Sequence, residues 1–395
     1  MHQTDDTHGV TTLELLFDLV FVYGMTQVTA FMARDLTGLG ILRGMVLMGM
    51  LWFGWTAYAW LGNQAKADEG PLRASLIIAM AAMFVVALTM PESFSDEPGG
   101  WYGPLVFVVA YAVVRVVHII VYVIAAGSDT GLRRQVLRSG ATGLVPLALL
   151  VVGAVVGAPY QVFCWVAAVV LDYGGIYALG ASGWRLPSAH HFSERHGLVI
   201  IIAIGESIVA VGMGLDGAPI SGALIAGAVL GIAVAVCLWW TYFDVVALVA
   251  GRKLTELQGA ERTAMARDSY TYLHLPMVAG IVLLALGGKV LLHEVAAHSS
   301  HISPVAVAAL YGGTALYLLA HIGFRWRNVH SINRQRLLAC ALLVTLAIAG
   351  SAFGTSLPPM LHLSTLAALL VVLVIYEVIR FAGARDDIRH AQLHG

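Results

Sequence analysis

Twelve apolar stretches, each long enough to cross a lipid bilayer, constrain the fold of this chain more than any other feature. A membrane-spanning helix needs about 20 predominantly apolar residues. Backbone groups left unpaired in hydrocarbon cost several kcal/mol each, so every such stretch is forced to be helical. We therefore predict an all-α, polytopic transmembrane helix bundle. The expected spans are 11–33, 41–62, 72–90, 101–125, 138–157, 160–180, 195–214, 219–247, 269–292, 304–324, 335–356 and 361–382.

The composition agrees with a membrane protein. The 395 residues are 59% hydrophobic and only 11% charged, whereas a soluble domain has about 25% charged residues. A soluble core could not bury this much apolar surface, so lipid must be the solvent for much of the chain. Nucleic-acid binding is excluded because it needs a concentrated basic face, which this sequence lacks.

Lysine and arginine residues are sorted to one side of the predicted bundle. Of the 22, 18 fall in or beside segments on one side, and only Arg34 and Arg43 on the other; Arg115 and Lys289 lie inside spans. Positive charge stays preferentially on the cytoplasmic side of short loops. We therefore predict a multi-pass protein of the bacterial inner (cytoplasmic) membrane with both termini cytoplasmic. The first eight residues lack a basic n-region, so a cleavable signal is not expected.

Breaks between the spans carry turn residues, and two prolines lie within spans. Pro146 and Pro276 predict kinks in the fifth and ninth spans. The longest inner segment, 248–268, is polar and is predicted to be a loop.

The chain also repeats weakly. A shift of 188 residues places Asp18 on Glu206, Gly24 on Gly212, Met25 on Met213 and Trp52 on Trp240. The order of these matches suggests two six-helix halves, 1–183 and 184–395. An even number of helices in each half gives both the same orientation, so the halves are predicted to be parallel repeats.

Two carboxylates within spans are the strongest candidates for a site. An ionisable residue at depth costs about 2.5–3.5 kcal/mol and usually faces the bundle interior. Glu206 lies eleven residues past Arg195, about 16 Å along a helix, which places it near mid-membrane; the repeat assigns Asp18 the same depth. The pair could flank a cation path or share a proton, or each could merely hydrogen-bond a neighbouring helix.

Arg115 is a buried cation that needs a partner. Its spacing from His118 puts both on one face of the fourth span. The candidate partners are Asp18, Glu206 and Asp172, which lies deep in the sixth span. A purely structural ion pair is the alternative interpretation.

Aromatic and further ionisable residues complete the predicted polar network. The indole N–H groups of Trp52 and Trp240 could donate to the two carboxylates, although interface anchoring explains many such tryptophans. Exposed or snorkelling head groups near the inner helix ends are expected for Asp244, Glu377, His274 and His321.

Metal and cofactor signals are weak. His191 and Glu194 share a helix face at the start of the seventh span and resemble half of a metal site, but a complete site needs more ligands. Helix-start or proton-handling chemistry explains them better, so neither a metal nor a cofactor is predicted. The three cysteines show no CxxC or disulfide spacing.

Four motifs together resemble the bacterial low-temperature-requirement A (LtrA) family over most of the chain. They are Glu14-Leu-Leu-Phe-Asp-Leu-Val-Phe-Val22, Met90-Pro-Glu-Ser-Phe94, His191-x-x-Glu194-Arg195-x-Gly197-Leu198 and Gly205-Glu206-Ser207. The resemblance implies a polytopic bacterial inner-membrane protein with no known substrate or reaction. The marked positions of the family carry over to Glu14, Asp18, His191, Glu194, Arg195 and Glu206. Leu16 stands where the family more often has Phe.

A second resemblance is more limited. The segment Phe17-Asp18-x-x-Phe21 is similar to the first-helix Phe-Ser-Asp motif of endolysosomal-type potassium and proton channels, which also use six-helix repeats. This chain lacks the serine of that motif, and the second half has Gly205-Glu206 instead of Phe-Asp.

The sequence favours a permeation function. Matched acids at depth predict a channel or transporter for a cation, proton or potassium, or for a small polar solute. The expected partners are the lipid bilayer and that ion or solute, with a homo-oligomer possible. The alternatives are a structural or regulatory membrane protein without turnover, and an intramembrane lipid-modifying enzyme using Glu194, His191 and Glu206 as acid and base.

Overall fold

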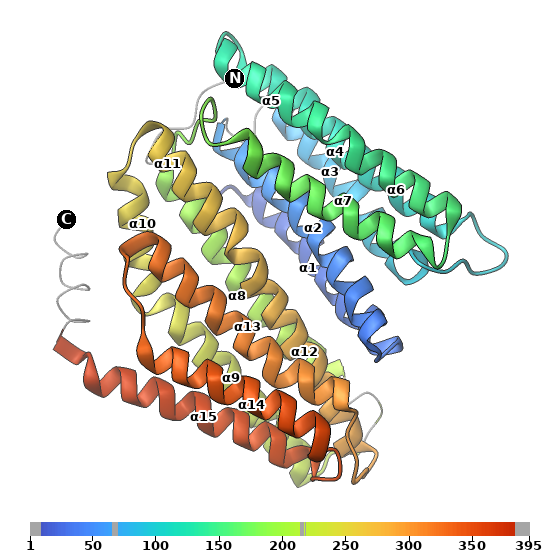
Figure 1. The fold of residues 1–395 in the computed structure, drawn as a ribbon, viewed down its shortest axis with the longest axis vertical. Helices are drawn as coiled ribbons and strands as arrows, with labels where there is room; N and C mark the ends of the chain where they lie inside the picture. The colour runs from blue at the N-terminus through green and yellow to red at the C-terminus, as the bar shows by residue number, and fades with distance from the viewer. Residues whose placement is uncertain (1–8, 65–69, 214–216, 218, 384–395) are drawn as a thin grey trace. The chain divides into compact units, whose positions relative to one another are not determined.

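The computed structural model describes residues 9–64, 70–213, 217 and 219–383 (Figure 1). Every regular element among these residues is a helix. The described chain forms two compact units. Unit 1 comprises the described residues of Met1–Met32, Leu39–Arg195 and Leu254–Thr271, and unit 2 those of Ala33–Gly38, His196–Lys253 and Tyr272–Gly395.

Unit 1 is built mainly from the first seven long helices. Within it α3 packs against α4, and α6 packs against α7, as neighbouring helices in the chain (Figure 1). The elements that contribute are α1 (Thr12–Arg34), α2 (Gly38–Gln64), α3 (Gly70–Thr89), η1 (Met90–Glu92), α4 (Gly103–Ala126), α5 (Thr130–Thr142), α6 (Leu144–Val156), α7 (Tyr160–Leu179), the first turns of α8 (Ala189–Met213), α11 (Gly259–Met265) and η2 (Ala266–Tyr272).

Unit 2 centres on two helices whose backbones approach closely. A Cβ at Gly280 would lie 2.6 Å from the carbonyl oxygen of Gly313, and one at Gly287 would lie 2.6 Å from the amide nitrogen of Leu310. Only glycine permits this contact between α12 and α13. The helices are the rest of α8, α9 (Gly222–Phe243), α10 (Val246–Glu256), α12 (His274–Ala296), α13 (Pro304–Val329), α14 (Arg334–Phe353) and α15 (Pro359–Arg380).

Twelve helical segments of the described chain are long and apolar enough to cross a membrane. They coincide in order and position with the twelve spans expected from the sequence, so the all-α multi-pass architecture is confirmed. The division into two parallel six-helix repeats, 1–183 and 184–395, stays a prediction.

Two local expectations need adjustment. The polar segment 248–268, predicted to be a loop, is largely helical: it contains most of α10, all of α11 and the first residues of the π-helical η2. Its charged residues therefore lie on helices, as polar residues can when their side chains face water.

The fifth span breaks at Gly143, between α5 and α6. The break lies three residues before Pro146, whose missing N–H cannot continue the hydrogen-bond ladder.

Candidate functional site

Arg195 lies fully buried in unit 1, between two carboxylates of α1. Its Nη1 donates to Oε1 of Glu14 at 3.2 Å, and its Nη2 donates to Oδ1 of Asp18 at 2.8 Å. All three side chains are at most 1% exposed. Glu14 and Asp18 are four residues apart, so they face the same side of α1 and can hold one guanidinium between them.

The Asp18 carboxylate is held by one oxygen. Oδ1 accepts from the indole Nε1 of Trp55 at 2.8 Å and from Arg195. The guanidinium carbon of Arg195 lies 5.4 Å from the centre of the Trp55 ring, so the same tryptophan also makes a cation–π contact. Oδ2 of Asp18 is buried and has no hydrogen-bond partner in the described part of the chain.

Glu14, in contrast, uses both of its oxygens. Oε2 accepts from the backbone N–H and the hydroxyl of Thr11, each at 3.0 Å, and lies 3.1 Å from Nε2 of His191. Oε1 takes the arginine. A Cβ at Gly62 would lie 2.5 Å from Oε1, so glycine on α2 leaves room for the carboxylate.

His191 lies beside a reciprocal pair of hydrogen bonds between Asn63 and Ser188. The side-chain amide of Asn63 donates through Nδ2 to the carbonyl of Ser188 at 2.6 Å, and its Oδ1 accepts the Ser188 N–H at 3.2 Å. This reciprocal pair sets the orientation of the amide, whose Nδ2 also lies 3.4 Å from Nδ1 of His191. The two ring nitrogens of His191 therefore face different groups, Nδ1 the Asn63 amide and Nε2 the Glu14 carboxylate.

The charges of this cluster do not balance. Arg195 carries one positive charge and faces two carboxylates, Glu14 and Asp18. Ionisation of both carboxylates therefore leaves one buried negative charge that Arg195 does not compensate. A buried charge of this kind is costly unless it is paired or neutralised. Oδ2 of Asp18 is the carboxylate oxygen of this cluster that has no hydrogen-bond partner among the described residues.

The structure pairs Arg115 with Asp172, one of the three predicted partners. Nη1 of Arg115 on α4 contacts Oδ2 of Asp172 on α7. The guanidinium also lies 4.6 Å from the centre of the Phe53 ring. His118 packs its ring against that of Tyr58, with centroids 5.4 Å apart. One cation meets one carboxylate here, so this pair is balanced.

The predicted role of Trp52 as a donor to Asp18 is wrong. Nε1 of Trp52 donates to the backbone carbonyl of Thr271 at 2.8 Å, while Trp55, one turn farther along α2, donates to Asp18. Both indoles are buried. Which of the two tryptophans reaches Asp18 depends on how α2 is rotated about its axis. The sequence does not specify which face of α2 meets α1.

Glu206 and Trp240 belong to unit 2. Glu206 is buried in α8, eleven residues beyond Arg195, and Trp240 lines a cavity at the end of α9. The matched function of Asp18 and Glu206, and a hydrogen bond between Trp240 and Glu206, stay predictions.

A second buried charge cluster, in unit 2, was missed by the sequence analysis. Nε and Nη2 of Arg336 each donate to Glu377, both at 2.7 Å, and Asn333 Nδ2 donates to the same carboxylate at 2.8 Å. Nη1 donates to the carbonyl of Thr241 at 3.1 Å and lies 2.6 Å from Nδ1 of His321. One arginine faces one carboxylate, so the cluster is balanced.

Exposed or snorkelling head groups were expected for Asp244, Glu377, His274 and His321. The expectation is wrong for the last three. Glu377 is 6% exposed, and His321 and His274 are fully buried. His274 Nε2 lies 2.7 Å from the hydroxyl of Tyr242. Each polar head finds a partner on a neighbouring helix, which satisfies it more effectively than reaching the interface. The signal was present: Arg336 begins one span and Glu377 ends the next, so both lie on the same side.

Glu194 stands apart from the buried cluster although it belongs to the same motif. Its side chain is exposed, and Oε2 accepts the backbone N–H of Val10 at 3.3 Å. No group of three or more His, Cys, Asp or Glu residues in the described chain is arranged to hold a metal ion.

Comparisons with known proteins agree with the motifs. The family model described as bacterial low temperature requirement A protein (LtrA) matches residues 9–375. Uncharacterized protein RA0937 of Rhizobium meliloti (strain 1021) is 28% identical over 291 residues, which are 69% of this chain and 67% of that protein. No solved structure matches. The buried Glu14–Asp18–Arg195 cluster is therefore formed by motif residues of a chain that belongs to the LtrA family.

Proposed function

We propose that this protein is a channel or transporter of the bacterial inner membrane, with both termini cytoplasmic, and that it moves a cation through unit 1. The proton is the species that the site supports best. The observation that carries the proposal is the excess carboxylate of the buried Glu14–Asp18–Arg195 cluster, with Oδ2 of Asp18 left without a partner.

The geometry at Asp18 suits proton transfer better than a purely structural role. Arg195 and Trp55 both hold Oδ1 of Asp18, so the carboxyl group stays fixed while Oδ2 gains or loses a proton. Uptake neutralises the excess charge, and release restores it. Intramembrane carboxylates of this kind mark proton relays and ion pathways in pumps and transporters. Potassium or a small polar solute beside Oδ2 would satisfy the same charge and belongs to the same test.

Flux across proteoliposomes tests the proposal. Purified protein is reconstituted with a pH-sensitive dye inside, a potassium gradient provides the driving force, and proton and potassium fluxes are recorded separately. We expect proton flux well above that of empty liposomes and at least a tenfold loss in Asp18→Asn. The amide keeps an acceptor for Trp55 and Arg195 but removes the titratable oxygen. Glu194→Gln is the matched control, because Glu194 is exposed, and it should retain the flux.

The outcomes are decisive for the proposal. It is rejected if wild-type protein moves no proton, potassium or small polar solute, or if Asp18→Asn moves as much as wild type. A monodisperse elution profile for Asp18→Asn is required before its flux is compared. If that variant does not fold, the triple variant Arg195→Gln with Glu14→Gln and Asp18→Asn, which removes all three charges of the cluster, takes its place; flux equal to wild type would assign a structural role.

A further inference from the structure

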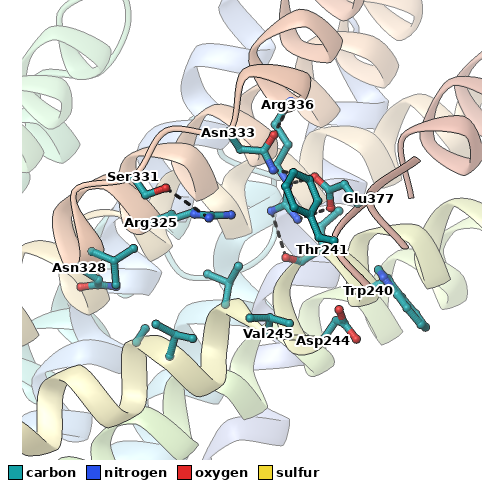
Figure 2. A pocket seen from close by; sticks show the side chains of 15 residues that line it. Trp240, Thr241, Asp244, Val245, Arg325, Asn328, Ser331, Asn333, Arg336 and Glu377 are labelled. Carbon is teal, nitrogen blue, oxygen red and sulfur yellow. Dashed lines mark hydrogen bonds and ion pairs between the residues drawn. The ribbon is translucent and has the colours of Figure 1, made fainter. Parts of the chain in front are cut away.

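Unit 2 contains a cavity of about 360 Å³ at the ends of several of its helices. It is formed where the ends of α9, α13 and α15 meet the starts of α10 and α14. Figure 2 shows the Arg325 side chain extending from α13 into this cavity toward Arg336, with Asn328 and Ser331 near its base. The cavity therefore combines polar and apolar lining at the arginine-bearing ends of the helices.

Arg325 is the chemically unusual group in this cavity. Its Nη2 donates to the hydroxyl of Ser331 at 3.3 Å, and no carboxylate among the described residues forms an ion pair with it. The other arginine of the cavity, Arg336, is held by both oxygens of Glu377. A partly buried guanidinium with most of its donors unused matches a phosphate, which it can bind through two parallel hydrogen bonds.

The opposite wall of the cavity is apolar. Val245, just before α10, lines it together with Val246 and Val249 at the start of that helix, and Phe381 lines it just after the end of α15. The same helix ends carry the lysine and arginine residues that mark a membrane–water interface. A cavity with a guanidinium on one side and valines on the other, at this level, fits an amphiphile better than a free ion. Asp244 also lines it, so a head group that carries an ammonium beside its phosphate is favoured over one with further negative charge.

We propose that this cavity binds the phosphate of a phospholipid head group, with Arg325 and Ser331 as its ligands and the valine wall against the glycerol and upper acyl carbons. A zwitterionic head group such as phosphoethanolamine fits best. The inference is independent of cation movement through unit 1.

Native mass spectrometry of the delipidated protein tests this site. The probes are dioleoyl-phosphatidylethanolamine, dioleoyl-phosphatidylglycerol, dioleoylglycerol and inorganic phosphate, each titrated separately. We expect one high-affinity phosphatidylethanolamine per chain, weaker phosphatidylglycerol and no comparable binding of dioleoylglycerol, which lacks the phosphate. Arg325→Gln should weaken phosphatidylethanolamine binding at least tenfold, and Arg325→Lys less. Arg327→Gln is the matched control, because Arg327 lies on the same helix but does not line the cavity.

A second variant distinguishes a lipid from free phosphate. Val249→Phe fills the apolar wall and leaves Arg325 in place, so it should abolish lipid binding and spare any binding of inorganic phosphate. The proposal is overturned if Arg325→Gln and Arg325→Lys bind phosphatidylethanolamine as wild type does, if dioleoylglycerol binds equally well, or if inorganic phosphate binds tightly in Val249→Phe and displaces lipid from wild type.

Discussion

Two buried arginines, one in each unit, show how the same residue types acquire different roles. Arg195 of unit 1 lies between two carboxylates of α1, whereas Arg336 of unit 2 meets one carboxylate of α15. Both are nearly inaccessible, and both lie near the start of a helix. The two arginines are therefore alike in burial and in the residue types around them. The two clusters differ in the number of carboxylates that face the arginine. We propose that the balanced cluster holds its helices together and that the unbalanced one exchanges a proton.

The Arg336 cluster is also the more completely hydrogen-bonded of the two. Glu377 accepts two bonds from the arginine and one from Asn333, and the arginine's third nitrogen reaches a backbone carbonyl. A buried pair costs desolvation, which only good geometry and further hydrogen bonds offset. In unit 1 one oxygen of Asp18 is left out of this network. Incomplete bonding of a buried group is typical of functional sites, which agrees with the role that we propose for Asp18.

Removing Arg195 should produce the largest effect. In Arg195→Gln the carboxylates of Glu14 and Asp18 remain buried without their shared cation. Loss of one partner from a buried ion pair costs about 3–5 kcal/mol, and two carboxylates are stranded here. We expect no monodisperse protein by size-exclusion chromatography in detergent. The triple variant that adds Glu14→Gln and Asp18→Asn removes all three charges and should recover folded protein. A single variant with wild-type yield and melting temperature would contradict the assigned cluster.

The carboxylate-to-amide change gives the sharpest contrast between the two units. Glu377→Gln strands the Arg336 cation and should destabilise the protein by about 3–5 kcal/mol. Asp18→Asn, the same chemical change, removes the excess charge from unit 1 and should alter stability far less. Thermal unfolding in one detergent, followed by tryptophan fluorescence, compares the two variants directly.

A double variant in unit 2 separates charge from packing. Arg336→Met with Glu377→Leu replaces a balanced pair by apolar groups, which is often neutral for stability. We expect most of the stability lost in Glu377→Gln to return. Equal melting temperatures for Asp18→Asn and Glu377→Gln would break the distinction between balanced and unbalanced clusters.

The indole donors allow a finer comparison within unit 1. Trp55 donates to a carboxylate and Trp52 to a backbone carbonyl. A hydrogen bond to a charged group contributes about 1.5–3 kcal/mol, and one between neutral groups about 1 kcal/mol. Trp55→Phe should therefore lower the melting temperature more than Trp52→Phe, its matched control, which loses a similar volume. A larger loss for Trp52→Phe would contradict the assignment of the Asp18 donor.

The sequence predicted the fold because the dominant force can be read one segment at a time. An apolar stretch of sufficient length has to form a helix in lipid, whatever lies beside it. The polar segment 248–268 escaped this argument, since water leaves its backbone free to form loop or helix. For that segment, contacts with the rest of the protein decide, and the sequence does not specify them.

The sequence predicted several residues of the site but not how they pair. Asp18, Arg115 and Asp172 were selected because charge at depth is costly, and the motif added Glu14, His191 and Arg195. Which charges meet depends on how the helices are rotated about their axes, which composition does not encode. Hence the sequence analysis did not pair Asp18 with Arg195. Glu377 was misassigned for a related reason, because a residue at a helix end can reach either water or a buried partner.

The smallest effect is expected at an exposed ion pair, which completes the comparison with the buried ones. Arg185 lies 3.1 Å from Asp129, and their side chains are 54% and 34% exposed. Such pairs contribute little, so Arg185→Gln should leave the melting temperature almost unchanged. Asp129 has a further role: its side chain caps α5 by accepting the backbone N–H of Leu132 at 2.9 Å. Asp129→Ala should therefore cost roughly 1 kcal/mol.

That contribution should depend on pH in a defined direction. The backbone N–H of Leu132, helped by the Arg185 guanidinium, holds the pKa of Asp129 below its ordinary value. A carboxyl whose pKa is lower in the folded protein stabilises it fully above the pKa of the unfolded chain, about 4, and loses this effect as pH falls through the folded value. The difference in melting temperature between wild type and Asp129→Ala should thus be constant near neutral pH and shrink in acid. A difference that grows on acidification would show that this carboxylate does not cap α5.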